Sequence, residues 1–303
     1  MRDNFFPGFG SELKWRKMKN NDKDIFPAED MLRDLEDNYV SACARFLSRD
    51  INKDPVWMLN GKKKESDGKS QRQILSGLII SNKSTIIPVL AKNIEIPKPK
   101  FLGSFFQINK IHSIQGLKEE VIILEDTMIR SGKKISEIID YDLMSLDYNS
   151  GQCAVGSVQQ NLVLRVPGLS DLDALAPLQA AYEHEEVLHK GSVFSAAASR
   201  VNLGNIITNG KILAAELSGR MVGKINVSGI SFTRYLVGGV FVHPEFRGKG
   251  IAGQMTARFI SSLLNEGRGI TLFVKKANVP AKKLYSGLGF KVIGDYRITY
   301  FYS

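Results

Sequence analysis

The chain has 303 residues, which exceeds one typical domain, and 43% of them are hydrophobic, enough to bury a full core. No apolar run approaches the ~18 residues of a membrane span, and the first residues lack the apolar segment of a secretory signal. The two cysteines and four histidines show neither a disulfide framework nor metal-ligand spacing. Composition therefore argues against a membrane protein and favours a cytoplasmic protein without a metal centre.

The net charge of +10 is unevenly distributed along the chain. Residues 1–150 carry 24 Lys and Arg against 22 Asp and Glu, whereas residues 151–303 carry 17 against 9. The excess in the second half favours a polyanionic ligand there. Nucleic acid is a weak candidate, because no basic run is interleaved with the aromatic residues that stack on bases.

Hydrophobic periodicity and turn residues predict an α/β domain in the N-terminal half. In chain order we expect a helix over 28–49, strands over 74–80, 85–90 and 102–108, a helix over 117–130 and a strand over 141–146. Gly68-Lys69-Ser70 looks like the end of a phosphate-binding P-loop. However, Lys63 stands where that motif needs its first glycine, so a solvated loop is expected.

The C-terminal half alternates more clearly between strands and helices. Its expected order begins with a strand over 162–166, helices over 171–188 and 193–203, and strands over 211–217, 221–227 and 235–242. A helix over 250–265, a strand over 270–274, a helix over 279–287 and two short strands over 290–293 and 297–301 follow.

The segment from Val240 to Gly253 has the features of a phosphate-binding loop. An apolar strand ends, a Pro-containing turn follows, and glycines at 248, 250 and 253 precede an amphipathic helix. The N–H groups in the first turn of a helix bind phosphate oxygens. We therefore predict a pyrophosphate cradle at the start of this helix.

A nicotinamide dinucleotide is one alternative, because Gly248–Gly253 matches the pattern G-x-G-x-x-G. Three arguments disfavour it. Residues 244–246 separate the strand from the first glycine, and Lys275-Lys276 stands where an acidic residue should bind the ribose. Only about 50 residues follow Gly253, too few for a doubly wound sheet.

Another family fits better. Arg247-x-x-Gly250-x-Ala252, after a strand ending in Val-His-Pro, resembles the acyl-CoA loop of the GNAT superfamily of N-acetyltransferases, whose pattern is Arg/Gln-x-x-Gly-x-Gly/Ala. A second element similar to that family runs from Asn278 to Phe290, with Asn278 and Tyr285 seven residues apart on one helix face. The resemblance covers about residues 160–303.

The resemblance implies an α/β fold of the α+β type, with a mixed, mostly antiparallel central sheet flanked by helices. It implies an acyl-CoA-binding N-acetyltransferase domain at residues 156–303, after an N-terminal α/β domain at residues 1–155. In the N-terminal half, Ile111–Gly116 would take the place of the Arg247–Gly250 loop, with one glycine and no arginine. That half is either a degenerate second copy, similar to tandem acetyltransferases, or an unrelated α/β cap domain.

The resemblance also implies acetyl-CoA as co-substrate and assigns roles. Tyr285 would protonate the departing thiolate, although a tyrosine packed in the core is the alternative. Asn278 would hold the pantetheine arm and start its helix, and the strand edge at 240–242 would pair with the pantetheine amides and polarise the thioester carbonyl. The residues expected to bind the cofactor are Val240, Phe241, Val242, Arg247, Gly248, Lys249, Gly250, Ile251, Ala252, Gly253, Asn278 and Tyr285.

The sequence leaves the general base and the acceptor open. Some family members have a carboxylate five residues before the asparagine, where this chain has Phe273. Glu183 and Glu186, on a helix expected to border the acceptor cleft, are the best remaining bases, with a solvated helix face as the alternative. A non-catalytic acyl-CoA-binding protein is the second hypothesis for the chain. The expected partner is an amine of unknown identity, and a homodimer is left open.

Overall fold

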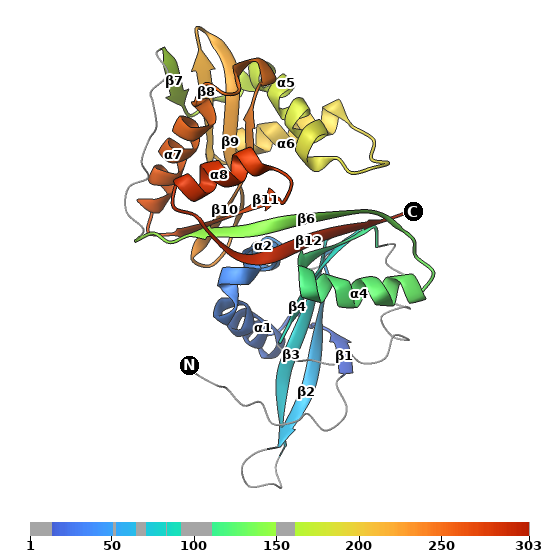
Figure 1. The fold of residues 1–303 in the computed structure, drawn as a ribbon. Helices are drawn as coiled ribbons and strands as arrows, with labels where there is room; N and C mark the ends of the chain where they lie inside the picture. The colour runs from blue at the N-terminus through green and yellow to red at the C-terminus, as the bar shows by residue number, and fades with distance from the viewer. Residues whose placement is uncertain are drawn as a thin grey trace. The chain divides into compact units, whose positions relative to one another are not determined.

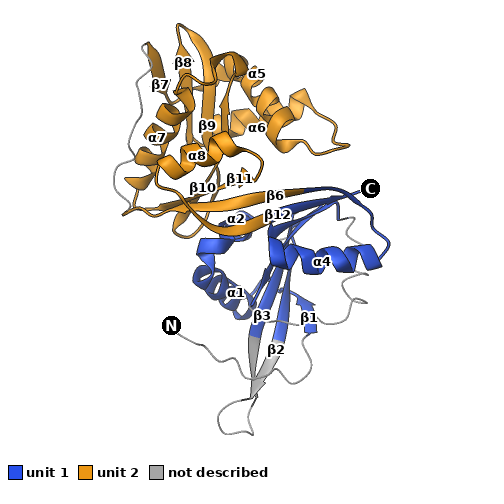
Figure 2. Cartoon of the chain, viewed as in Figure 1, with its two compact units in different colours: residues 1–138, 297–303 blue, residues 139–296 orange. Residues whose placement is uncertain are grey.

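The structure is a computed structural model that describes residues 14–50, 53–64, 71–82, 84–91, 111–149 and 161–302. The chain divides into two compact units, residues 1–138 with 297–303, and residues 139–296 (Figures 1 and 2). The chain passes into the second unit within strand β6 (Ile135–Leu146) and returns within strand β12 (Lys291–Phe301). The domain boundary expected at 155–156 lies outside the described residues and stays a prediction. No helix in the described part of the chain is long and apolar enough to cross a membrane.

The first unit has a sheet with strand order β1-β2-β3-β4-β5, which is antiparallel except for the parallel pair β4–β5. The predicted helix over 28–49 is two helices, because Leu35 leaves the helical region of backbone space at φ −106° and ψ 2°. The elements are β1 (Lys14–Lys17), α1 (Asp22–Asp34), α2 (Glu36–Leu47), β2 (Val56–Lys64), β3 (Gln71–Asn82), β4 (Thr85–Leu90), β5 (Ser113–Leu117) and α4 (Lys118–Arg130).

Helix α4 covers the core of the first unit, as its sequence periodicity predicted. Val121, Leu124 and Met128 are fully buried and pack with sheet residues that include Ile79 and Ile86. Three such side chains on one helical face, removed from water, contribute most of the stabilisation that attaches a helix to a sheet. The predicted strand over 102–108 lies outside the described residues.

The second unit has a six-stranded sheet with the order β6-β11-β10-β9-β8-β7. Only β10 and β11 run parallel, while the other neighbouring pairs are antiparallel. Its elements are β7 (Leu162–Arg165), α5 (Leu172–Tyr182), a π-helical turn η2 (Glu183–Val187), α6 (Ala196–Thr208), β8 (Ile212–Leu217), β9 (Arg220–Ile230), β10 (Arg234–Val242), α7 (Ile251–Leu264), β11 (Gly269–Lys275) and α8 (Val279–Gly287).

Both units repeat one order of elements. In chain order, a strand is followed by two helices, three antiparallel strands, a parallel strand, a helix and a final strand, which is β6 in the N-terminal half and β12 in the C-terminal half. The counterpart of α7 would fall between β4 and β5, where residues 92–110 lie outside the described chain. The repeated order supports a second copy of one fold over an unrelated cap domain.

The repeat corrects one sequence-based assignment. We expected Ile111–Gly116 to replace the Arg247–Gly250 loop, but Ser113–Leu117 is strand β5, the counterpart of β11. In the order of elements, the position of the loop falls after β4 instead, among residues that lie outside the described chain. The error arose because Gly116 precedes a helix, and a glycine before a helix does not by itself distinguish a loop from a strand end.

The end of the chain gives a second correction. Two short strands were expected over 290–293 and 297–301, but β12 is one continuous strand. Between those segments, Asp295 pairs with Lys276 at 2.5 Å and the ring of Tyr296 stacks on Phe273 at 4.1 Å. These contacts hold the backbone extended where Gly294-Asp295 suggested a turn.

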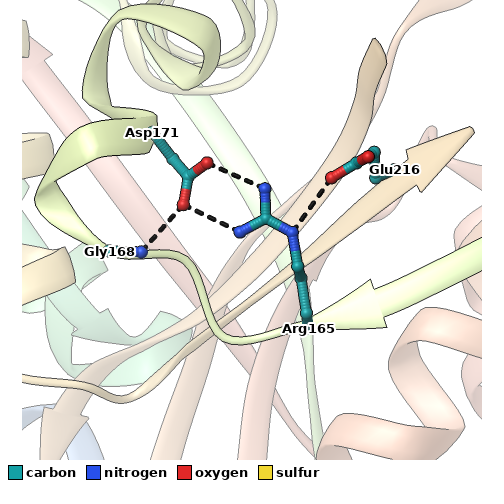
Figure 3. A network of polar contacts seen from close by, with 4 residues as sticks. All are labelled: Arg165, Gly168, Asp171 and Glu216. Atoms are coloured by element: carbon teal, nitrogen blue, oxygen red, sulfur yellow. Dashed lines mark hydrogen bonds and ion pairs between the residues drawn. The ribbon is translucent and has the colours of Figure 1, made fainter. Parts of the chain in front are cut away.

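An Arg165-centred network fixes the start of helix α5 against the sheet (Figure 3). The guanidinium group donates two hydrogen bonds of 2.8 Å to Asp171 and one of 2.9 Å to Glu216. Asp171 also accepts the Gly168 N–H at 2.9 Å. The hydrogen bonds from Arg165 contribute most to lowering the pKa of Asp171 to about 2, and the hydrogen bond from Gly168 adds to their effect. The network sets the direction of α5, which carries the side chains that face the site described below.

We expect Asp171→Asn to lower the free energy of unfolding by about 1 kcal/mol at pH 7, a value reduced for the partial exposure of Arg165. Because the folded pKa is depressed, this contribution is present above the unfolded value of 3.8 and is lost as pH falls through about 2. Urea unfolding from pH 7 downward should therefore show the two proteins converging. The matched control is Asp173→Asn, whose side chain is 84% exposed and should change stability little.

Candidate active site in the second unit

The loop between β10 and α7 is shaped by two glycines in the left-handed region. A 3₁₀ turn over Pro244–Phe246 leads to Gly248 and Gly250, both at φ +75°, and α7 begins at Ile251. Gln254 is the first residue of the helix whose N–H is paired, with the Gly250 carbonyl at 3.1 Å. Within the described residues, the six backbone N–H groups from Gly248 to Gly253 donate no hydrogen bond.

Six free donors at a helix start suit a phosphate-bearing ligand. The positive end of the helix dipole lies at the same place, and no side chain caps it. A Cβ at Gly248 would meet no atom within 4 Å, so the space beside the loop is open. The predicted pyrophosphate cradle therefore has the donors and the room that a coenzyme A pyrophosphate requires.

The two basic residues of the loop have different surroundings. Arg247 donates from Nε to the Val242 carbonyl at 3.0 Å and pairs through Nη2 with Glu185 at 2.8 Å. Lys249 places its ammonium group 5.0 Å from the centroid of the Phe246 ring. Arg247 thus links the loop to η2, whereas Lys249 has no ion pair among the residues that the structure describes.

Strand β10 separates from β11 beside this loop. Their parallel pairing runs from Arg234 with Gly269 to Val237 with Leu272 and extends no further along these two fully described strands. The register of β10 with β9 also shifts between Gly238 and Phe241, which marks a β-bulge. The edge of β10 from 240 to 242 therefore faces no partner on the β11 side, as the expected pairing with an extended ligand requires.

Tyr285 lies on α8, 6% exposed, with its ring edge-on to Phe290 at 5.9 Å. Burial raises the pKa of its hydroxyl, and the charges of Tyr182 and Glu186 add to that effect. The ring packs in the core, and the hydroxyl keeps its proton through neutral pH, so both the acid and the packing role stay open. Asn278 caps the same helix by accepting the Ala281 N–H at 3.2 Å, which gives the helix start expected for it.

The acidic residues of η2 are held by ion pairs and hydrogen bonds. Glu183 accepts a hydrogen bond from Gln179 at 2.6 Å, and Glu186 pairs with Lys275 of β11 at 3.0 Å. Both side chains are partly buried, so they do not form a fully solvated helix face. Phe273, in the position of a family carboxylate, packs on Tyr296.

Sequence reasoning missed Lys224 on β9. The side chain is fully buried, and its Nζ donates to the Gly239 carbonyl at 3.1 Å and to Asn226 Oδ1 at 3.3 Å. Nζ also lies 4.5 Å from the centroid of the Tyr182 ring. Burial lowers the pKa of Lys224 to about 7, against the charge of Glu183. A lysine within the apolar run from Met221 to Val227 was the available signal.

The first unit differs at the counterpart of the open edge. The pairing of β4 with β5 also stops early, at Ile86 with Ile114. There, however, Glu120 of α4 accepts the Leu90 N–H at 2.7 Å and the Tyr39 hydroxyl at 2.6 Å. Burial raises the pKa of Glu120 to about 8, despite these two hydrogen bonds. The end of β4 is thus occupied by the protein's own side chain.

Comparison with known proteins bears on the fold and on part of the second unit. Residues 208–292 match the family model "Acetyltransferase (GNAT) domain". No curated protein matches the sequence. Among solved structures, a GCN5-related N-acetyltransferase from Sphaerobacter thermophilus has a TM-score of 0.61 at 14% identity, covering 96% of each chain. A GNAT-family acetyltransferase from Colwellia psychrerythraea has a TM-score of 0.55 at 11% identity, covering 96% of this chain and 100% of that one.

A tandem GNAT protein from the clavulanic acid biosynthesis pathway has a TM-score of 0.59 at 12% identity, and the match covers 95% of this chain and 98% of that protein. Such a match over the whole chain requires both units to have the fold. The chain therefore has the fold of a tandem GNAT protein, and residues 208–292 of its second unit match the acetyltransferase (GNAT) family model.

Proposed function

We propose that the protein is an acyl-CoA-dependent N-acetyltransferase that moves an acetyl group from acetyl-CoA to an amine. The observation that carries the proposal is the row of six unpaired N–H groups from Gly248 to Gly253, next to the unpaired edge of β10. A pyrophosphate and an extended amide-containing arm are joined in coenzyme A in the same order. The family match at residues 208–292 supports acetyl transfer as the reaction class.

In this proposal, the chain's own residues bind the cofactor in three places. The N–H groups of Gly248, Lys249, Gly250, Ile251, Ala252 and Gly253 hold the pyrophosphate, helped by the charges of Arg247 and Lys249. The backbone of Val240, Phe241 and Val242 pairs with the pantetheine amides, while the Phe241 and Val242 side chains stay buried. Asn278 keeps the start of α8 in place beside the arm.

The thioester supplies the activated acetyl group. The acceptor nitrogen forms a bond to the acetyl carbon in a ternary complex, and the carbon–sulfur bond breaks with its electron pair left on sulfur. Tyr285 donates its hydroxyl proton to that sulfur, a role that its raised pKa permits at neutral pH. A β10 backbone N–H stabilises the carbonyl oxygen as it gains negative charge.

The acceptor amine must lose a proton before or during attack. Glu183 and Glu186 are the proposed acceptors of that proton, through water, because Phe273 offers no carboxylate. Their contacts with Gln179 and Lys275 hold them at the end of α5, and the charge of Glu186 acts on Tyr285. The effect of the Glu186 charge on the pKa of Tyr285 supports the pairing of these two groups as base and acid.

A non-catalytic acyl-CoA-binding protein is the competing hypothesis, and the absent carboxylate at Phe273 is what favours it. Release of free thiol from acetyl-CoA in the presence of a panel of amines separates the two hypotheses. Amine-dependent thiol release supports the enzyme. Tight cofactor binding with no release above the rate in buffer supports the binding protein.

Gly250→Asp should weaken acetyl-CoA binding at least tenfold, which corresponds to about 1.4 kcal/mol. The variant adds a side chain and a negative charge beside the pyrophosphate donors. Titration calorimetry measures the affinity. Gly267→Asp is the matched control, because Gly267 has the same φ of +75° but follows the other end of α7. If Gly250→Asp and Gly267→Asp bind acetyl-CoA with equal affinity, the loop from Gly248 to Gly253 does not hold the pyrophosphate.

Each chain should bind one acetyl-CoA. In the first unit, residues 91–112 between β4 and β5 contain a single glycine and no arginine, and Glu120 already accepts the Leu90 N–H. The stoichiometry from calorimetry checks this expectation. Two sites per chain would show that the first unit opens between β4 and α4 despite these contacts.

Tyr285→Phe should leave cofactor affinity nearly unchanged and lower kcat by roughly 100-fold, the lower end for a lost acid–base group, because a thiolate leaves readily. The assay uses an amine identified in the panel. Tyr235→Phe is the control, since it removes the hydroxyl of a buried tyrosine that binds Glu266 outside the proposed site. Full kcat in Tyr285→Phe would leave Tyr285 with a packing role only.

A further inference from the structure

Lys224 is unusual for a core residue. It is 0% exposed, and no ion pair forms on it among the residues that the structure describes. Its partners are a backbone carbonyl, an amide oxygen and the face of the Tyr182 ring. An amine buried without a counter-ion destabilises a fold. Retaining one therefore points to a role in the site rather than in stability.

The Gly239 backbone is held tightly on the side of Lys224. Gly239 has φ +61°, and a Cβ there would lie 1.9 Å from Asn226 Oδ1 and 2.9 Å from Lys224 Nζ. Tyr182 approaches the same residue, since the Gly239 N–H forms a hydrogen bond that opposes the rise of the Tyr182 pKa caused by burial. Lys224, Asn226 and Tyr182 together fix the conformation of the β10 bulge.

This arrangement sets the direction of the following peptide group. The Gly239 carbonyl points toward Lys224, and the described peptide bonds are all trans. In a trans peptide, the N–H of the next residue points opposite to the carbonyl. The Val240 N–H therefore points away from Lys224. Neither Gly239 nor Val240 has a partner in the registers with β9 and β11.

We propose that Lys224 is a positioning residue that holds the Gly239–Val240 peptide so that the Val240 N–H donates to the acyl carbonyl of the bound thioester. The inference rests on the proposed function, because it needs acetyl-CoA on the open edge of β10. It specifies which backbone N–H polarises the carbonyl and which side chain orients it. Lys224 acts through the backbone and contacts no reacting atom.

The test uses acetyl-CoA labelled with ¹³C at the acetyl carbonyl and isotope-edited infrared spectroscopy, so that no acceptor amine is needed. In the wild-type protein, a hydrogen bond from the Val240 N–H should lower the carbonyl stretching frequency of bound acetyl-CoA relative to that of free acetyl-CoA. Lys224→Met removes the donor to the Gly239 carbonyl. In this variant the stretching frequency of bound acetyl-CoA should move most of the way back to that of free acetyl-CoA. Its acetyl-CoA affinity, from calorimetry, should change by less than about threefold.

Two further variants complete the experiment. Thr271→Val is the control, because it replaces a fully buried polar side chain on β11 and should keep the natural shift. Asn226→Ala removes the second hydrogen-bond partner of Lys224 and should reduce the shift in part. If Lys224→Met does not fold, the Asn226→Ala result decides.

The possible outcomes distinguish failure of the proposed function from failure of the role of Lys224. Natural protein that binds no acetyl-CoA overturns the proposed function and this inference with it. If acetyl-CoA binds without a change in its carbonyl stretching frequency, the role of Lys224 alone is overturned. The same follows if Lys224→Met and Asn226→Ala both fold and keep the wild-type shift. Loss of affinity in Lys224→Met together with loss of the shift indicates a collapsed bulge, and that outcome also counts against a positioning role.

Discussion

The separation of β10 from β11 after Val237 is the constraint on which the rest of the second unit depends. Two parallel strands that stay paired leave no free backbone edge for a ligand. The bulge at Gly238–Gly239 bends β10 away, and the loop at Gly248–Gly250 then turns the chain into α7. As a result, the free N–H groups of the helix and the free edge of the strand belong to one continuous segment.

The two units show how one topology can have an open or an occupied strand edge. Each has a parallel strand pair that stops pairing early. In the second unit the edge of β10 beyond that point faces no strand on the β11 side, whereas in the first unit Glu120 accepts the Leu90 N–H and is itself held by the Tyr39 hydroxyl. A buried carboxyl group with a raised pKa satisfies a backbone N–H without adding a full charge to the core. Fold alone therefore does not assign a cofactor to both units.

Buried polar groups in the second unit are concentrated around the bulge. Lys224, Asn226 and Tyr182 lie around Gly239. The nearby Tyr182 and Glu186 also help to raise the pKa of Tyr285. A low-dielectric environment strengthens each of these interactions and makes each of them sensitive to small displacements. The Arg165 network at the start of α5 fixes the helix that carries Tyr182, so it also contributes to the geometry of the site.

Local sequence determined the elements with strong periodicity and the loop with its glycine spacing. Helices α4 and α8, the start of α7 and the cap at Asn278 could be predicted, because short-range patterns of apolar, capping and glycine residues specify them. Only the tertiary structure decided the rest. The continuous strand β12 depends on Lys276 and Phe273, and Ser113–Leu117 forms a strand through pairing with β4. The role of Lys224 depends on Gly239, fifteen residues away, because burial and hydrogen bonding between strands are not encoded in local periodicity.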